Sequence, residues 1–94
     1  MIMENYVFVF LGENATIPSG IFTKKEIAWQ WISKNGLSGS LNMLPLDISL
    51  YDWAIGKDYF NPQKDYQKEA KFIQRFSSAS IEHWHFENGE CQTE

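Results

Sequence analysis

One stretch of this chain specifies a helix from both ends: FTKKEIAWQWISKNGL, residues 22–37. Thr23, followed three positions later by Glu26, matches a capping box. In such a box the two side chains accept hydrogen bonds from backbone N–H groups that the first helical turn leaves unpaired. Phe22 before the cap and Ile27 inside the helix can pack together as a hydrophobic staple. We therefore expect a helix that Thr23 caps.

The other end of the same stretch carries a stop signal. Gly36 can adopt the left-handed backbone conformation that a larger side chain resists, and Leu37 can then fold back onto Ile32. Apolar positions recur at helical spacing, so one side of the helix should be buried, most simply against a sheet. That side consists of Ile27, Ala28, Trp31 and Ile32.

Strand patterns lie before and after this helix. Residues 6–11 are a run of aromatic and β-branched residues and predict a buried central strand. The turn formers that follow can close a hairpin onto a short strand at 20–22. Alternation over 37–44 predicts a half-buried strand that Pro45 ends or places at a sheet edge. Residues 80–89 predict the last strand and a turn after it.

Two further helices are expected in the second half of the chain. Asp47 or Ser49 can cap a short helix that runs through Ile55 and ends at Gly56. Asn61 and Pro62 have the pattern of a cap and first helical position for a longer helix. That helix would extend to about Phe76 with Tyr66, Glu69, Phe72, Ile73 and Phe76 at helical spacing.

Together these elements predict a two-layer α+β domain. Its sheet would be mainly antiparallel with three or four strands, one well-capped helix and one or two further helices. A right-handed crossover through the first helix could make one strand pair parallel. The 94 residues form one domain, in which we expect residues 1–4 and 90–94 to be loose.

Composition excludes several classes of protein. Hydrophobic residues make up 44% of the chain and aromatic residues 16%, which is too apolar for a disordered segment, and no run is long enough for a membrane span. The net charge of -4 disfavours general nucleic-acid binding. Cys91 has no cysteine with which to pair, and the N-terminus has no signal-peptide pattern, so we expect a cytoplasmic protein.

The motif with the clearest chemistry is His83-Trp84-His85. On a strand the two imidazoles point to the same face, with their Cα atoms about 7 Å apart, and both could reach one metal ion. Zinc normally takes at least three protein ligands. Glu87, on the same face, or Cys91, folding back, could supply the third.

A second interpretation of this segment involves no metal. In it, the histidines form the wetter face of the strand, while Trp84 and Phe86 anchor its other face in the core. This interpretation is the simpler one, because it needs no third ligand.

Acidic residues offer a weaker case for catalysis. Asp47 and Asp52 could form a carboxylate pair, but general acid and base work needs two carboxyl groups with different pKa values at a controlled separation. Asp47 is more simply a helix cap, and Asp52 can pair with Arg75. Glu13 lies in a turn-forming loop that could present a polar surface to a ligand. The chain contains no phosphate-binding glycine loop and no nucleophile elbow.

Trp29 is out of place on its helix. At 100° per residue it lies about 130° from the apolar side, so we expect it to be partly exposed. An exposed tryptophan is a typical anchor of a protein interface, which makes Trp29 a candidate for self-association or partner binding. The alternative is that a loop covers it, for example the region around Asn61.

Three groups of short blocks resemble a family of small, stand-alone bacterial domains of unknown function. They are GENA (12–15) with PSGIF (18–22), then LSG (37–39) with PLD (45–47) and YDWA (51–54), then FIQRF (72–76) with SAS (78–80) and Glu82-His83. The resemblance spans most of the chain and implies a self-contained bacterial cytoplasmic domain, with no activity, substrate or catalytic residue attached. It places a polar residue where this chain has Trp29.

Two functions follow as hypotheses. The favoured one is a non-enzymatic protein-interaction domain without a cofactor, acting on another protein or on a second copy of itself. Size and charge suggest by analogy an inhibitor or immunity protein that binds a basic partner. The alternative is a metal-binding or small-molecule-binding protein, or a hydrolase, that uses His83 and His85, with zinc as the metal.

Overall fold

The computed structural model describes residues 5–92. The terminal segments 1–4 and 93–94, which belong to the ends expected to be loose, lie outside the described residues. The elements in chain order are β1 (Tyr6–Gly12), β2 (Gly20–Phe22), α1 (Lys25–Asn35), β3 (Gly39–Pro45), α2 (Leu50–Gly56), the 3-10 helix η1 (Asp65–Lys68), α3 (Ala70–Ile73), β4 (His83–Glu87) and β5 (Glu90–Cys91).

The strands form one antiparallel sheet in the order β2-β1-β3-β4-β5. This confirms the α+β class, but the sheet has five strands where the sequence predicted three or four. The additional strand, β5, lies in the tail expected to be loose and pairs with β4 across a turn at Asn88 and Gly89, both of which have positive φ. No neighbouring pair in this sheet is parallel, because α1 connects β2 to β3 and β1 lies between them.

Helix α1 begins later than the capping box predicted. Its cap is Lys24, which is extended and makes no side-chain capping hydrogen bond, so the predicted cap at Thr23 is wrong. Phe22 is still paired with Phe8 of β1, and this strand pairing delays the turn into the helix. The staple does not form either, because Ile27 remains 50% exposed.

The end of α1 follows the sequence prediction. Gly36 has φ 62° and ψ 40°, the left-handed conformation. Its N–H donates to the Ser33 carbonyl oxygen at 3.2 Å, and the Leu37 N–H donates to the Ile32 carbonyl oxygen at 3.1 Å. These two bonds define a Schellman motif, which satisfies carbonyl groups that the helix end would otherwise leave unpaired.

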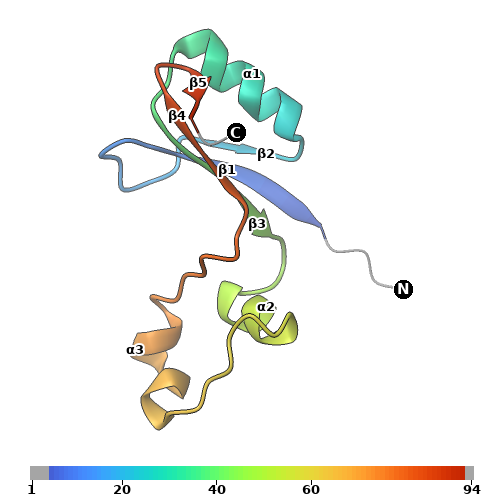
Figure 1. Ribbon diagram of the computed structural model, residues 1–94, viewed down its shortest axis with the longest axis vertical. Helices are drawn as coiled ribbons and strands as arrows, with labels where there is room; N and C mark the ends of the chain where they lie inside the picture. Colours follow the sequence, from blue (N-terminus) through green and yellow to red (C-terminus); the bar gives the residue numbers. More distant parts are fainter. Residues whose placement is uncertain (1–4, 93–94) are drawn as a thin grey trace.

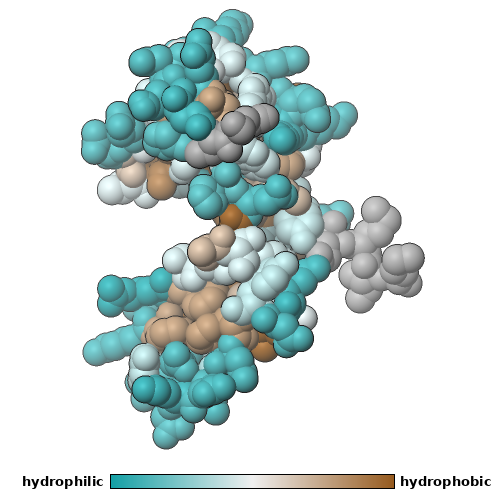
Figure 2. Space-filling view, viewed as in Figure 1, coloured by the Kyte–Doolittle hydropathy of each residue, from teal (hydrophilic) through white to brown (hydrophobic). Residues whose placement is uncertain are grey.

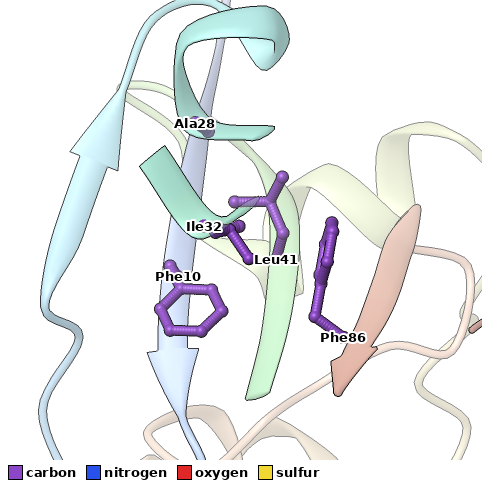
Figure 3. Packing of buried hydrophobic residues seen from close by; sticks show 5 residues of the cluster. All are labelled: Phe10, Ala28, Ile32, Leu41 and Phe86. Atoms are coloured by element: carbon purple, nitrogen blue, oxygen red, sulfur yellow. The ribbon is translucent and has the colours of Figure 1, made fainter. Parts of the chain in front are cut away.

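The core lies between α1 and one face of the sheet (Figure 1). Five buried side chains form it, and Figure 3 shows how they converge from α1 and three strands: Phe10, Ala28, Ile32, Leu41 and Phe86. Of the side of α1 predicted to be apolar, Ala28 and Ile32 are fully buried and Trp31 packs edge-on against Phe10, whereas Ile27 faces solvent.

Close packing also fixes how the sheet is built. A Cβ atom at Gly39 would lie 2.3 Å from the Leu11 carbonyl oxygen and 2.8 Å from the Gly12 Cα atom. Only a residue without a side chain lets β3 approach β1 this closely, so this glycine sets the pairing at one end of the central strand.

The helices after β3 form a second part of the molecule, which we call the helical lobe (residues 46–81). Ser49 caps α2 by accepting a hydrogen bond from the Asp52 N–H at 3.0 Å, as one of the two predicted caps. The long helix predicted from Asn61 to Phe76 is wrong: the segment contains only η1 and α3, because Glu69 between them is extended, with φ -91° and ψ 157°.

A second hydrophobic cluster holds the helical lobe together, with Trp53, Ala54 and Ile81 buried. Figure 1 shows this lobe beyond the end of the sheet, away from α1. The radius of gyration is 14.9 Å, whereas a compact chain of this length would have about 12 Å. The molecule is therefore elongated, with two separate clusters of buried side chains. No helix within residues 5–92 is long and apolar enough to cross a membrane.

Two glycine substitutions test the helix end. Gly36→Ala should lower the free energy of unfolding by about 1 kcal/mol, because alanine resists the left-handed conformation. Nothing lies within 4 Å of the added Cβ, so the loss reports the backbone conformation alone.

The matched control is Gly56→Ala at the end of α2, where the added Cβ is also uncrowded and φ is not in the left-handed region. This variant should change the free energy of unfolding by less than about 0.5 kcal/mol or raise it. Equal losses in urea denaturation of the two variants would show that the left-handed conformation of Gly36 is not what matters.

Candidate functional site

The two candidate metal ligands lie on the outer face of β4. His83 and His85 are exposed, and the His83 Nδ1 atom lies 3.0 Å from the Ile81 carbonyl oxygen. Trp84 is half-buried and Phe86 is buried on the core side of the strand, as in the interpretation without a metal. Within residues 5–92 there is no group of three His, Cys, Asp or Glu side chains that could hold a metal ion. A zinc site here would need its third ligand from outside the described residues.

Trp29 is half-buried and has partners inside the domain. Its ring packs edge-on against Phe86 at a centroid distance of 4.8 Å and lies 6.2 Å from the ring of Trp84. The ammonium group of Lys25 lies over both tryptophans, 5.1 Å from Trp29 and 4.4 Å from Trp84. The sequence did not decide whether Trp29 is covered by another part of the chain. In the structure β4 and Lys25 cover it, whereas Asn61, the loop position suggested for this role, lies in the helical lobe.

The three polar candidates are in different places. Glu13 is exposed in the loop between β1 and β2. Asp52 is exposed in the first turn of α2, and Arg75 follows α3 at the edge of a groove. Asp52 and Arg75, both within the described part of the chain, form no ion pair with each other. The structure thus does not assemble these three residues into one site.

The helical lobe contains an open groove of about 610 Å³, which we call the phenylalanine groove. Three half-buried rings form its floor: the ring centroid of Phe60 lies 5.7 Å from that of Phe72 and 5.0 Å from that of Phe76. Figure 2 shows the corresponding hydrophobic area on the surface of this lobe. The groove is lined by Tyr59, Phe60, Lys71, Phe72, Arg75, Phe76, Ser77, Ser78, Ala79 and Ser80.

The wall behind the floor is also aromatic. Tyr51 is buried, and its ring lies between 5.5 and 6.3 Å from those of Phe60, Phe72 and Phe76. Its hydroxyl group donates a hydrogen bond to the Gln67 carbonyl oxygen at 2.8 Å, which ties α2 to η1. The floor is therefore held in place from behind, while its outer side stays open to solvent.

Charged and hydroxyl side chains border the phenylalanine groove. Lys71 and Arg75 line it and are both exposed. The serine-rich segment that precedes β4 lies along the groove as well, where the Ser80 N–H donates to the Ser78 Oγ atom at 3.2 Å. The groove thus combines an apolar aromatic floor with two cations.

Sequence reasoning missed this site because it placed Phe72 and Phe76 at helical spacing on one continuous helix. In the structure that helix is interrupted at Glu69, and the two rings meet Phe60 from an earlier loop. One signal was present in the sequence: the segment 59–76 contains five aromatic residues with basic residues between them.

The fold is that of an elongated α+β domain with an open aromatic groove outside its sheet. The family model for DUF7710, a domain of unknown function, matches residues 7–92, so the chain belongs to this family. This confirms the resemblance to a family of domains of unknown function. Neither a curated protein nor a solved structure matches the chain.

The contacts of Trp29 predict a structural role that stability measurements can test. Trp29→Ala should lower the free energy of unfolding by about 2 kcal/mol, because it removes the edge-on contact with Phe86 and uncovers Trp84. Ile27→Ala on the same helix is the control, and its 50% exposed side chain should contribute less than about 0.5 kcal/mol. If the two variants unfold at the same urea concentration, the packing of Trp29 contributes little to stability.

Proposed function

We propose that this domain acts by binding another protein through the phenylalanine groove, and not by catalysing a reaction. The observation that carries the proposal is the group of three adjacent phenylalanines that stay half-exposed on one surface. A monomeric domain gains by covering such side chains, since each Å² of apolar surface removed from water contributes about 25 cal/mol. An aromatic surface left open in a folded lobe is typical of an interaction site.

The chemistry of the lining supports binding over catalysis. The groove is lined by aromatic, serine, alanine and basic side chains, and none of its lining residues is Asp, Glu, His or Cys. A serine hydroxyl becomes a nucleophile when a base lies beside it. Within the described residues no hydrogen bond joins a groove serine to Lys71 or Tyr59, the two lining side chains that could act as that base. His83 and His85, on which the hydrolase alternative depends, lie on β4 in the other part of the molecule.

An inhibitor or immunity protein is one form that such a function could take, because blocking a partner requires only a stable contact. A second copy of the chain is another possible partner. A cytoplasmic location fits both, since the single cysteine can form no disulfide within the chain.

A side chain placed into the phenylalanine groove tests the proposal without disturbing the core. Ala79 is exposed and lines the groove, so Ala79→Gln adds a polar group over the phenylalanine floor. Ala70 is exposed on α3 outside the groove lining, and Ala70→Gln is the matched control. Each tagged variant would be crosslinked in its native cells, and the captured proteins quantified by mass spectrometry. We expect Ala79→Gln to weaken partner binding by about tenfold or more and Ala70→Gln to retain it.

Sedimentation velocity on the same three proteins shows whether the partner is a second copy. If the wild-type protein and Ala70→Gln self-associate and Ala79→Gln does not, the contact between the two copies lies at the groove. A set of captured proteins and a sedimentation profile that are the same for all three proteins would contradict the proposed function.

A further inference from the structure

Although the chain carries a net charge of -4, the lining of the phenylalanine groove contains two basic side chains and no acidic one. Residues 57–75 contain five of the eight basic residues and three of the twelve acidic residues. The rest of the chain therefore has three basic residues against nine acidic ones. The helical lobe as a whole, which also contains Asp47 and Asp52, is neutral. Because exposed charges are screened beyond about 8 Å at physiological ionic strength, a ligand in the groove responds more to Lys71 and Arg75 than to the net charge of the chain.

The two cations nearest the floor are available to a ligand. Lys71 lies in α3 and Arg75 in the turn that follows it, and both line the groove. Neither forms an ion pair with a carboxylate of the described residues. The guanidinium group of arginine can hold a carboxylate through two parallel hydrogen bonds, and lysine contributes a mobile positive charge.

The serine-rich border adds hydrogen-bonding groups. Ser77 and Ser80 are exposed along the groove, and their hydroxyl groups can donate to carboxylate or peptide carbonyl oxygens. These donors, the two cations and the apolar floor of Phe60, Phe72 and Phe76 all line the same groove.

We infer that the groove binds an acidic, apolar peptide segment of a partner protein, in which aliphatic or aromatic side chains cover the phenylalanines and Asp or Glu side chains meet Lys71 and Arg75. This inference rests on the proposed function and gives the chemistry of its partner. It reverses the expectation from net charge, which favours a basic partner.

The open shape of the groove favours a peptide segment over a small acid. Sites for small molecules enclose most of the ligand surface, whereas this floor and both of its borders are accessible. A single-stranded nucleic acid could also use aromatic rings and cations, but its many phosphates would meet the acidic remainder of the chain. A peptide places only a few negative charges, and all of them can lie beside the two cations.

Selection from a random peptide display library tests the inference. Peptides that bind the wild-type protein and fail to bind Ala79→Gln are groove ligands by definition, and we expect Asp and Glu to be enriched in them next to aliphatic and aromatic residues. In fluorescence anisotropy, the double variant Lys71→Glu/Arg75→Glu should bind them roughly 10- to 100-fold more weakly. Raising the salt concentration should weaken wild-type binding.

The matched control is Lys64→Glu/Lys68→Glu, which makes the same change of charge at the N-cap and the last residue of η1, outside the groove lining. It should weaken the selected peptides by less than about threefold. Equal effects of the two double variants would show that general charge, and not the groove cations, governs binding, and would overturn the inference.

The other outcomes separate the inference from the proposed function. Groove ligands that are neutral or basic would overturn the acidic partner and leave the proposed function standing. No peptide that distinguishes the wild-type protein from Ala79→Gln would count against both. Binding of a labelled single-stranded oligonucleotide that Ala79→Gln abolishes would overturn the peptide inference in favour of a nucleic acid.

Discussion

The packing of one helix on one face of a five-stranded sheet limits everything else in this protein. Helix α1 can cover only a small area of the sheet, and five side chains fill the space between the two layers. A chain of 94 residues with fifteen aromatic side chains cannot place all of them there. The remaining rings gather in a second cluster beyond the end of the sheet, where Trp53 is buried but three phenylalanines are covered on one side only. The candidate binding surface therefore consists of aromatic side chains for which the core between α1 and the sheet has no space.

The helical lobe depends on its side-chain contacts more than on its helices. Its elements α2, η1 and α3 have seven, four and four residues, lengths at which an isolated helix is not stable in water. Ring contacts around Tyr51 and its hydrogen bond to Gln67 hold the pieces together. A ligand on the phenylalanine floor would add contacts to the same cluster, so binding and local stability should be linked.

Charged residues, like exposed apolar side chains, are distributed unevenly between the two parts of the molecule. The helical lobe contains five basic and five acidic residues, whereas the rest of the chain has three basic residues against seven acidic ones. The net charge therefore belongs to the part outside the lobe, and at physiological ionic strength screening acts over a shorter distance than the 45 Å length of the molecule. Net charge alone is therefore a poor guide to the partner of a domain with two lobes. The position of Lys71 and Arg75 beside an apolar floor says more about what can bind there.

The sequence by itself determined those features that depend on near neighbours. Gly36 ends α1, Ser49 caps α2, and the turn formers after β1 close a hairpin, because each needs only residues a few positions away. The alternation of polar and apolar residues, together with the apolar runs, also predicted the α+β class.

Tertiary structure decided what depends on distant partners: pairing of Phe22 with Phe8 delays α1, and β4 covers Trp29. It also brought Phe60 against Phe72 and Phe76 to make the groove. Those contacts join segments that are far apart in the sequence. Local sequence patterns do not show which distant segments will meet, so these contacts can be read only from the folded chain.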